Sequence, residues 1–288
     1  MIEAACVVDA RDALGECCLW CPATQKIWWV DVLRPCLQSF EPATGAHRVY
    51  PLPGRFCGCA VRRASGGLVL ALDEGLHSFD PETGSLDFLV QAEPAELGNR
   101  YNDGRCDRAG RLWIGTMDPD IQKASGSFYR IGVDLSVLKL LDGVTVPNST
   151  AFSPDDKVLY FADTPRHTIW AFDFDIAGGT ISDRRVFADL TERKGLPDGS
   201  CVDAEGFLWN AEYGGGQLTR YAPDGRVDRT IPVPVTNPTC CCFGGPAFST
   251  LYITSAMPEG GPDPGRHDGG LLALDAGTRG LPEATFGG

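Results

Sequence analysis

The chain has 288 residues, of which 43% are hydrophobic and 22% are charged, a composition typical of soluble globular proteins rather than of disordered or fibrous ones. Its net charge is −13, which argues against nucleic acid or an anionic membrane surface as a partner, because a polyanion would be repelled. No apolar run approaches the roughly 18–20 residues of a membrane span, and the N-terminus lacks the features of a secretory signal, so we expect a cytoplasmic protein.

One strand pattern recurs six times along the chain. Each copy follows a turn and consists of a short apolar strand, most often with Leu-Trp or Leu-Tyr near its start, that ends on a small or acidic residue. A second strand follows roughly ten residues later in each case. Six copies about 40–50 residues apart predict an all-β, six-bladed β-propeller with about four strands in each blade. In chain order the copies are residues 26–31, 67–72, 111–116, 158–163, 207–212 and 250–254.

The segments that flank the repeats complete this prediction. Residues 6–9 read as a strand that precedes the first copy, and we expect it to complete the last blade and close the ring between the two ends of the chain. No linker or low-complexity stretch interrupts the repeats, so residues 1–288 are predicted to form a single domain. The residues after Gly280 carry no pattern and are expected to be frayed.

Twelve cysteines are present, three of them consecutive at residues 240–242. Without a secretion signal we expect them to stay reduced. A structural zinc site needs two correctly spaced cysteine pairs, and the chain supplies only one Cys-x-x-Cys, at Cys18 and Cys21. We therefore interpret the cysteines as small buried apolar residues of the strands.

Candidate functional residues stand about 9–14 positions ahead of four repeat copies, in segments that we expect to be loops at the mouth of the channel. Glu16, Asn102, Asn148 and Asp198 are the main ones. Each alone has an ordinary explanation, such as a surface acid, an Asx-turn or a Pro-Asp-Gly turn. Their shared position in different blades instead predicts convergence, and carboxylate and amide oxygens suit a hard divalent cation.

These segments resemble the SMP-30/gluconolactonase/regucalcin family of six-bladed propellers over nearly the whole chain. The resemblance rests on the order and spacing of several motifs rather than on one. It is carried by residues 14–16, 28–31, 100–104 (Arg-Tyr-Asn-Asp-Gly), 115–117 (Gly-Thr-Met), 147–148 with 151–155, 197–199 (Pro-Asp-Gly) with 202–206, and 241–245.

The resemblance implies a sugar lactone lactonase that hydrolyses an aldonolactone to the aldonic acid. In it one divalent metal ion would be bound by Glu16, Asn148 and Asp198, with Ca²⁺ expected first and Zn²⁺, Mn²⁺, Mg²⁺ or Fe²⁺ as alternatives. Asp198 would also be the general base, although metal ligation depresses the pKa of a carboxylate and makes it a weaker base unless one oxygen stays free. The substrate-binding residues would be Arg100, Asn102 and Asp120. The expected partner is a small sugar lactone, and the expected state is a monomer.

The chain departs from the family pattern at three places. Cys17-Cys18 replace Gly-Pro or Ser-Pro, Ser149-Thr150 replace Gly-Leu, and Asp120 stands where some members have a glutamate. Substrate preference should depend on the loops at residues 118–121 and on a lid-like segment at residues 257–268. Three alternatives remain open: a calcium- or ligand-binding propeller without catalysis, a hydrolase of phosphotriesters or other esters, and a protein-interaction propeller.

Overall fold

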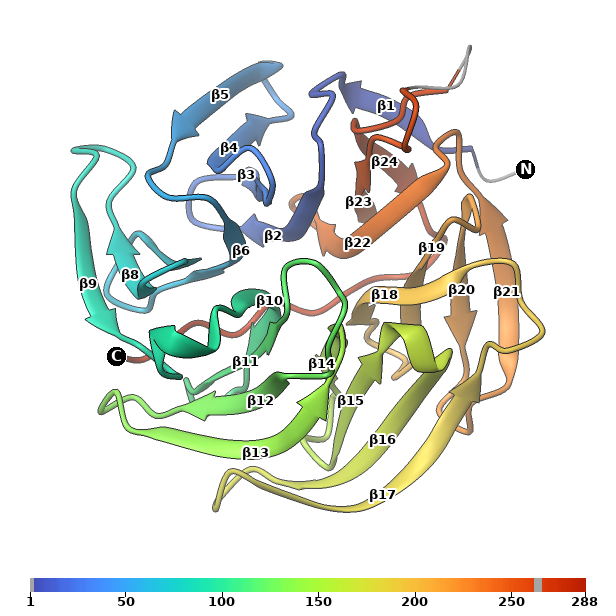
Figure 1. The fold of residues 1–288 in the computed structure, drawn as a ribbon. Coiled ribbons are helices and arrows are strands. Elements are labelled where there is room, and N and C mark those ends of the chain that lie inside the picture. The colour runs from blue at the N-terminus through green and yellow to red at the C-terminus, as the bar shows by residue number, and fades with distance from the viewer. Residues whose placement is uncertain (1–2, 262–265) are drawn as a thin grey trace.

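The structure is a computed structural model that describes residues 3–261 and 266–288. Within these residues the strands form six four-stranded antiparallel sheets, arranged as blades around a common centre (Figure 1). One edge strand of each sheet (β2, β6, β10, β14, β18 or β22) lies nearest the centre, and the strand at the opposite edge lies at the rim. The prediction of an all-β, six-bladed propeller is confirmed.

The blades follow the chain in order. Blade 1 comprises β2 (Gly15–Cys21), β3 (Lys26–Asp31), β4 (Cys36–Glu41) and β5 (Ala46–Pro51), and blade 2 comprises β6 (Cys57–Arg62), β7 (Leu68–Leu72), β8 (Gly75–Phe79) and β9 (Leu86–Val90). Blade 3 comprises β10 (Arg100–Cys106), β11 (Leu112–Met117), β12 (Gly126–Ile131) and β13 (Val137–Val144), and blade 4 comprises β14 (Pro147–Phe152), β15 (Val158–Asp163), β16 (Thr168–Asp175) and β17 (Thr180–Asp189). Blade 5 comprises β18 (Leu196–Val202), β19 (Leu208–Tyr213), β20 (Gln217–Tyr221) and β21 (Val227–Pro232).

Blade 6 is built from both ends of the chain. Its inner three strands are β22 (Asn237–Gly244), β23 (Thr250–Ala256) and β24 (Leu271–Asp275), and its outer strand is β1 (Ala5–Val8). Strand β1 pairs antiparallel with β24, with Ala5 opposite Ala273 and Cys6 opposite Leu272. This pairing confirms the predicted ring closure, because the two ends of the chain share one sheet.

The six repeat copies are the second strands of the blades, β3, β7, β11, β15, β19 and β23. Their aromatic residues are buried because both faces of a blade pack against neighbouring blades. Three tryptophans, Trp29, Trp113 and Trp209, are fully buried. Each donates its indole N–H to a buried aspartate, at 2.8 Å for Asp12, 2.8 Å for Asp107 and 2.9 Å for Asp203. In these three blades the repeated strand therefore buries a tryptophan whose only polar atom, the indole nitrogen, is hydrogen-bonded.

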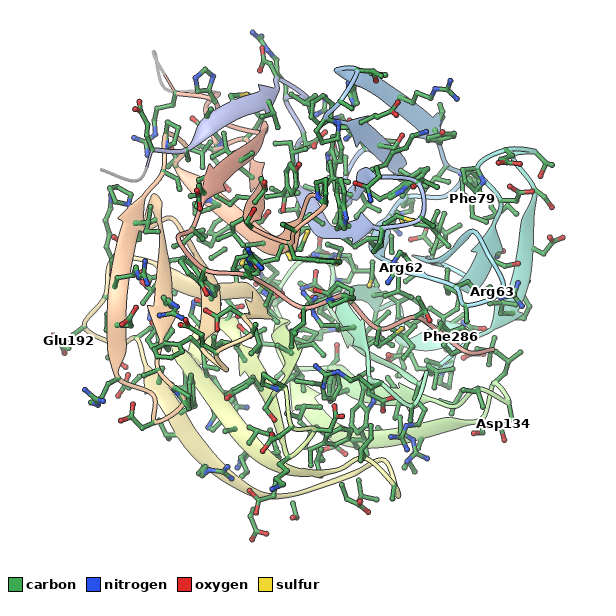
Figure 2. All side chains as sticks on the ribbon, turned by 180° about the vertical axis from the view of Figure 1, so that it is seen from behind. Arg62, Arg63, Phe79, Asp134, Glu192 and Phe286 are labelled. Carbon is green, nitrogen blue, oxygen red and sulfur yellow. The ribbon has the colours of Figure 1, made fainter. Side chains whose placement is uncertain are left out.

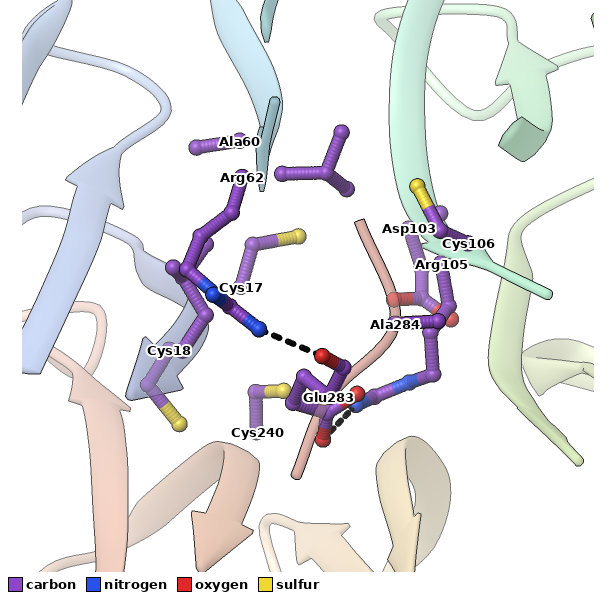
Figure 3. A pocket seen from close by; sticks show the side chains of 13 residues that line it. Cys17, Cys18, Ala60, Arg62, Asp103, Arg105, Cys106, Cys240, Glu283 and Ala284 are labelled. Atoms are coloured by element: carbon purple, nitrogen blue, oxygen red, sulfur yellow. Dashed lines mark hydrogen bonds and ion pairs between the residues drawn. The ribbon is translucent and has the colours of Figure 1, made fainter. Parts of the chain in front are cut away.

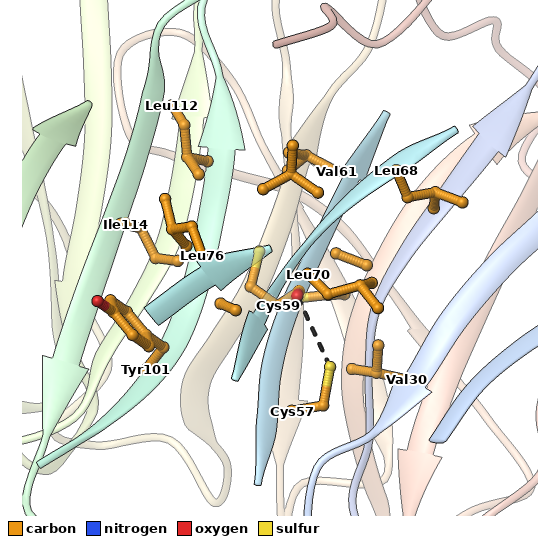
Figure 4. Close-up of a cluster of buried hydrophobic side chains, with 14 of the residues drawn as sticks. Val30, Cys57, Cys59, Val61, Leu68, Leu70, Leu76, Tyr101, Leu112 and Ile114 are labelled. Atoms are coloured by element: carbon orange, nitrogen blue, oxygen red, sulfur yellow. Dashed lines mark hydrogen bonds between the residues drawn. The ribbon is translucent and has the colours of Figure 1, made fainter. Parts of the chain in front are cut away.

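Cysteines fill part of the core between the blades. All twelve are free thiols, and nine of them are buried. Figure 4 shows Cys57 and Cys59 of β6 among the leucine, valine and isoleucine side chains that blades 1, 2 and 3 contribute. These cysteines pack as small apolar side chains, as expected from the sequence.

The C-terminal segment, residues 280–288, is not frayed as the sequence suggested. It runs across the back of the ring from blade 6 to blades 2 and 3, seen as the red trace behind the centre in Figure 1 and from behind in Figure 2. Phe286 is fully buried; its N–H donates to Arg62 O and its carbonyl accepts from Ala64 N, both at 2.8 Å. The prediction was wrong because these bonds are isolated bridges to distant strands, which leave no local periodicity.

Two short 3₁₀ helices, η1 (Ala95–Leu97) and η2 (Thr164–Arg166), lie in loops on the opposite, front face. None of the helices among the described residues has the length and apolar character that a bilayer span requires.

Candidate functional site

The innermost strand of every blade carries an irregularity at the same height. The antiparallel register shifts between Glu16 and Leu19 in β2, and between corresponding residues of the other five inner strands. Such β-bulges turn side chains away from the regular alternation and are frequent beside active sites. The six bulges therefore lie together around the centre of the ring, and in blade 2 the bulged residue is a glycine, Gly58.

Four of the six bulges hold the polar residues that the sequence singled out: Glu16, Asn102, Asn148 and Asp198. The expectation that they lie in loops was wrong, since all four belong to β2, β10, β14 and β18. Their Gly-, Pro- and Asn-rich surroundings indicated a turn, but the same composition also suits a bulged strand. By the register, Glu16 and Asn148 are the last paired residues before the shift, and Asn102 and Asp198 are the first unpaired ones, so the four lie within one residue of the same place in their blades.

Arg100, Asn102 and Asn148 form a hydrogen-bonded chain between blades 3 and 4. Arg100 Nη1 donates to Asn102 Oδ1 at 2.7 Å, and Asn102 Nδ2 donates to Asn148 Oδ1 at 3.0 Å. Asn148 Nδ2 in turn donates to Thr164 Oγ1 at 2.8 Å. These bonds fix both amide groups, and because an amide oxygen has two lone pairs, Asn148 Oδ1 keeps one for a further ligand.

Asp198 is held through its backbone and lacks a partner at one side-chain oxygen. Its carbonyl accepts from Ser149 Oγ at 2.6 Å and from Asn210 Nδ2 at 2.8 Å. The residue is 4% exposed, and its Oδ1 atom has no hydrogen-bond partner. A buried carboxylate oxygen without a partner is costly and calls for a ligand.

The surroundings of the site disfavour the charged forms of its carboxyl groups. Burial, reinforced by Asp103, raises the pKa of Glu16 to about 8. Burial, followed by the charges of Glu16 and Asp103, raises the pKa of Asp198 well above its usual range. Burial lowers the pKa of Arg100 to about 10, against the opposing charges of Glu16 and Asp198. One guanidinium thus serves two carboxyl groups, so without a further cation these groups favour their protonated forms.

Glu16, Asn148 and Asp198 fit a divalent metal ion on these observations. They offer only oxygen atoms, they come from three blades, and the partnerless Oδ1 of Asp198 lies among mutually repelling carboxyl groups. Such donors suit Ca²⁺ and related hard ions. The described residues contain no group of three His, Cys, Asp or Glu side chains placed to hold a metal. The set proposed here has only two carboxylates, from Glu16 and Asp198, and its third donor is the amide oxygen of Asn148.

Asp120 stands apart from the other predicted residues. It is exposed in the loop between β11 and β12, where its backbone carbonyl accepts from Gln122 Nε2 at 2.9 Å. The same loop is fastened near Arg100, since Ser125 Oγ donates to Asn99 Oδ1 at 2.8 Å. A substrate contact by Asp120 stays a prediction. Of the lid-like segment 257–268, residues 262–265 lie outside the described residues.

Three neighbours of the site were not predicted as site residues. Asp103 is buried and its Oδ2 accepts from Thr150 N at 2.7 Å; its place in the Asn-Asp-Gly run was the available signal. The pKa of Tyr213 is raised by burial and then by the charges of Asp198 and Glu16. Thr239 occupies the bulge of β22 in blade 6 and is fully buried. Nothing in the local sequence marks the last two.

Two of the departures from the family pattern, at Cys17 and Ser149, place the backbone in a strained conformation. Cys17 follows Glu16 with a φ of 51°, and Ser149 follows Asn148 with a φ of 59°. This left-handed conformation costs a residue with a Cβ about 1–2 kcal/mol. The backbone at these bulges is therefore strained in a way that glycine would relieve.

Comparisons with known proteins agree with this fold. Residues 14–257 match the family described as SMP-30/Gluconolactonase/LRE-like region. The chain is 35% identical to an L-arabinolactonase of Azospirillum brasilense, with 99% of this chain and 96% of the relative covered. It is 33% identical to regucalcin of Xenopus laevis, with coverage of 100% and 99%.

A solved structure shows the same likeness in three dimensions. The crystal structure of a calcium-binding protein, regucalcin, from Agrobacterium tumefaciens superposes with a TM-score of 0.93 at 32% identity. The alignment covers 99% of this chain and 97% of that one. The chain belongs to the SMP-30/gluconolactonase/LRE-like family.

Proposed function

We propose that this protein hydrolyses a sugar lactone of the aldonolactone type with the help of one divalent metal ion. The prediction of an enzyme that cleaves a carboxylic ester bond is confirmed by the lactonases among its relatives. The metal dependence and the substrate are our proposal. The observation that carries it is the buried Oδ1 of Asp198, which has no hydrogen-bond partner and lies within reach of the charge of Glu16.

Glu16, Asn148 and Asp198 would hold the metal ion. When bound, such an ion polarises the lactone carbonyl and stabilises negative charge on its oxygen. We propose Ca²⁺ as the first choice, because the donors are all oxygen atoms and a relative of the same fold is described as calcium-binding. A bound cation would also offset the repulsion between the Glu16 and Asp198 carboxylates.

Asp198 would act as the general base. One of its carboxylate oxygens would hold the metal ion, and the other would accept a proton from water as the water oxygen attacks the lactone carbonyl carbon. The ring C–O bond then breaks, and the proton passes to the departing ring oxygen to give the hydroxy acid. The carbonyl of Asp198 is fixed by Ser149 and Asn210, so the side chain starts from a defined backbone position.

Arg100 and Asn102 would orient the sugar. Arg100 is 6% exposed and its Nε atom has no partner, so that a donor is available for a ring hydroxyl or for the carbonyl oxygen. Asn102 uses its amide hydrogens on Pro147 O and Asn148 Oδ1, at 2.9 and 3.0 Å. We therefore assign substrate contact mainly to Arg100, and to Asn102 a contact through its oxygen together with the support of Asn148.

A lactone panel with added metal tests this proposal. Acid release from gluconolactone, xylonolactone, arabinonolactone and galactonolactone would be followed by pH-stat with Ca²⁺, Mn²⁺ or Zn²⁺, in the native protein and in Asp198→Ala. We expect hydrolysis of at least one lactone by the native protein, and a loss of about 10²–10⁴-fold in the variant. Equal rates in the two proteins would refute the mechanism. Metal binding without hydrolysis of any lactone would favour a binding protein.

A further inference from the structure

Arg105 crosses the channel on the side of the bulges that faces the C-terminal segment. Its Nε donates to the carbonyl of Thr150 in blade 4 at 2.9 Å, and its Nη2 donates to the carbonyl of Ser200 in blade 5 at 2.7 Å. Its side chain is 13% exposed. One planar guanidinium thus joins the inner strands of three blades, a geometry that suits arginine and not lysine.

The two carbonyls lie next to the predicted metal ligands. Thr150 comes two residues after Asn148, and Ser200 comes two residues after Asp198. Arg105 itself is on β10, the strand of Asn102. The guanidinium therefore ties together the three strands that carry Asn102, Asn148 and Asp198, just below their bulges.

Glu283 of the C-terminal segment holds Arg105 in place. Its carboxylate forms an ion pair with Arg105 Nη1, and its backbone carbonyl accepts from Arg62 Nη2 (Figure 3). Cys17, Cys240 and Asp103 surround a cavity of about 20 Å³ beside this pair, which has room for about one water molecule. The ion pair and the C-terminal segment thus lie together at this end of the channel.

We propose that Arg105, clamped by Glu283, is a positioning residue that sets the separation of the strands β10, β14 and β18 and thereby the affinity of the site for its cation. The part that concerns the cation rests on the proposed function. Arg105 donates to the two backbone carbonyls and to Glu283, and not to either of the predicted carboxylate ligands. It acts through the two carbonyls.

Simple electrostatics predicts the opposite effect of the same substitution. Arg105 is a positive charge within Coulombic reach of Asp103, so its removal should tighten the binding of a cation if charge alone mattered. Loss of a positioning residue should instead weaken binding, since supporting groups around a metal site typically contribute about 10–100-fold in affinity. The sign of the change therefore separates the two explanations.

The test measures Mn²⁺ and Ca²⁺ binding by calorimetry in four full-length variants. Arg105→Met removes the clamp, and Arg105→Met with Glu283→Gln removes both charges, so no uncompensated buried charge remains if the single variant folds poorly. Arg105→Lys keeps the charge without the planar fork. Arg108→Met is the matched control. Arg108 also joins blades 3 and 4, since it donates to Ser153 O at 3.1 Å and pairs with Asp156. It lies farther from the bulges than Arg105 does.

We expect Arg105→Met and the double variant to bind about 10–100-fold more weakly, Arg105→Lys to be intermediate, and Arg108→Met to match the native protein. Unchanged or tighter binding in Arg105→Met and the double variant, or an equal loss in Arg108→Met, would overturn the inference. Native-like binding in Arg105→Lys would also overturn it, because a positive charge without the planar guanidinium would then be enough to maintain the site.

Amide hydrogen exchange at residues 148–150 and 198–200 supplies a readout that does not depend on metal. Faster exchange in Arg105→Met than in Arg108→Met would support the positioning of the strands, and equal exchange would refute it. If the native protein binds none of the ions, the proposed function fails, and the exchange data still decide whether Arg105 positions the strands.

Discussion

Asp198 lies in the inner strand β18 and Asp203 directly follows the other end of that strand; both are buried, at 4% and 0% exposure. Asp203 is fully satisfied: its Oδ2 accepts from Arg220 Nη2 at 2.7 Å and from Trp209 Nε1 at 2.9 Å, and its Oδ1 accepts two backbone N–H groups. Asp198 faces other carboxyl groups and leaves Oδ1 without a partner. Two buried carboxyl groups five residues apart thus differ: Asp203 is fully hydrogen-bonded and Asp198 is not.

The contrast separates structure from function. A buried carboxylate that is completely hydrogen-bonded maintains the fold, because the removal of its charge leaves partner groups unpaired. One that stays uncompensated lowers stability and is kept only where a ligand completes it. Asp107 of blade 3 repeats the first case, with bonds to Trp113 Nε1 and Arg111 Nε at 2.8 and 2.7 Å. Asp198, beside the bulges, therefore lacks a hydrogen-bond partner at one oxygen, whereas Asp107 and Asp203 have partners at both oxygens.

The largest expected effect comes from Asp198→Asn. It keeps the shape of the side chain and removes the charge, so lactone hydrolysis should fall by about 10²–10⁴-fold. In the presence of a chelator the variant should be at least as stable as the native protein, because folding no longer buries a carboxyl group whose ionised form it disfavours. Turnover assays and urea denaturation check the two parts. A variant that keeps its activity, or that unfolds much more easily, would break the comparison.

Asp203→Asn should show the reverse pattern. The substitution leaves Arg220 and Trp209 without a full acceptor, and we expect a loss of about 3–5 kcal/mol in the free energy of unfolding, as for other broken buried ion pairs. Below the unfolding transition its rate per folded molecule should remain close to that of the native protein. A stable but inactive Asp203→Asn would contradict the assignment of this residue to the fold.

Metal affinity should depend on pH. In the metal-free protein burial and Asp103 raise the pKa of Glu16 to about 8, so below that pH a metal ion must displace a proton. The apparent affinity should therefore fall by about tenfold per pH unit as the pH drops from about 8 to about 6, with proton release on binding. Calorimetry in buffers of different ionisation enthalpy measures both quantities. Binding that is independent of pH and releases no proton would exclude Glu16 as a ligand.

The smallest effect concerns the strained residue beside Asn148. Ser149→Gly and Ser149→Ala both remove the hydroxyl that donates to Asp198 O at 2.6 Å, but only glycine relieves the φ of 59°. The glycine variant should be more stable than the alanine variant by about 1 kcal/mol. Thermal denaturation of the pair measures the difference, and equal stabilities would show that the bulge carries no strain.

Most of the fold was predictable, because each blade repeats one apolar strand at a regular spacing. The predicted strands at residues 26–31 and 158–163 coincide with β3 and β15, and the ring closure through β1 followed from the same pattern. The gathering of polar residues at the inner bulges was also predictable, because Glu16, Asn148 and Asp198 precede the repeats at similar distances; their role as metal ligands stays a prediction. Local composition misassigned them to loops, since a β-bulge and a turn use similar residues.

The back of the channel could not be predicted. Arg105 and Glu283 are separated by 178 residues, and the bridges made by residues 280–288 are single contacts to distant strands. Neither leaves a periodic signal. Burial of the pair depends on how the six blades close around the centre, which is a property of the assembled ring and not of any segment.

A cation held by Glu16, Asn148 and Asp198 is the central claim, and removal of that cation tests it most directly. Lactone hydrolysis would be measured after the protein is stripped with a chelator, after Ca²⁺, Mn²⁺ or Zn²⁺ is restored, and in Glu16→Gln treated alike. We predict that stripping abolishes hydrolysis, that a divalent ion restores it in the native protein, and that Glu16→Gln needs a much higher ion concentration. Full hydrolysis by the stripped protein would contradict the central claim.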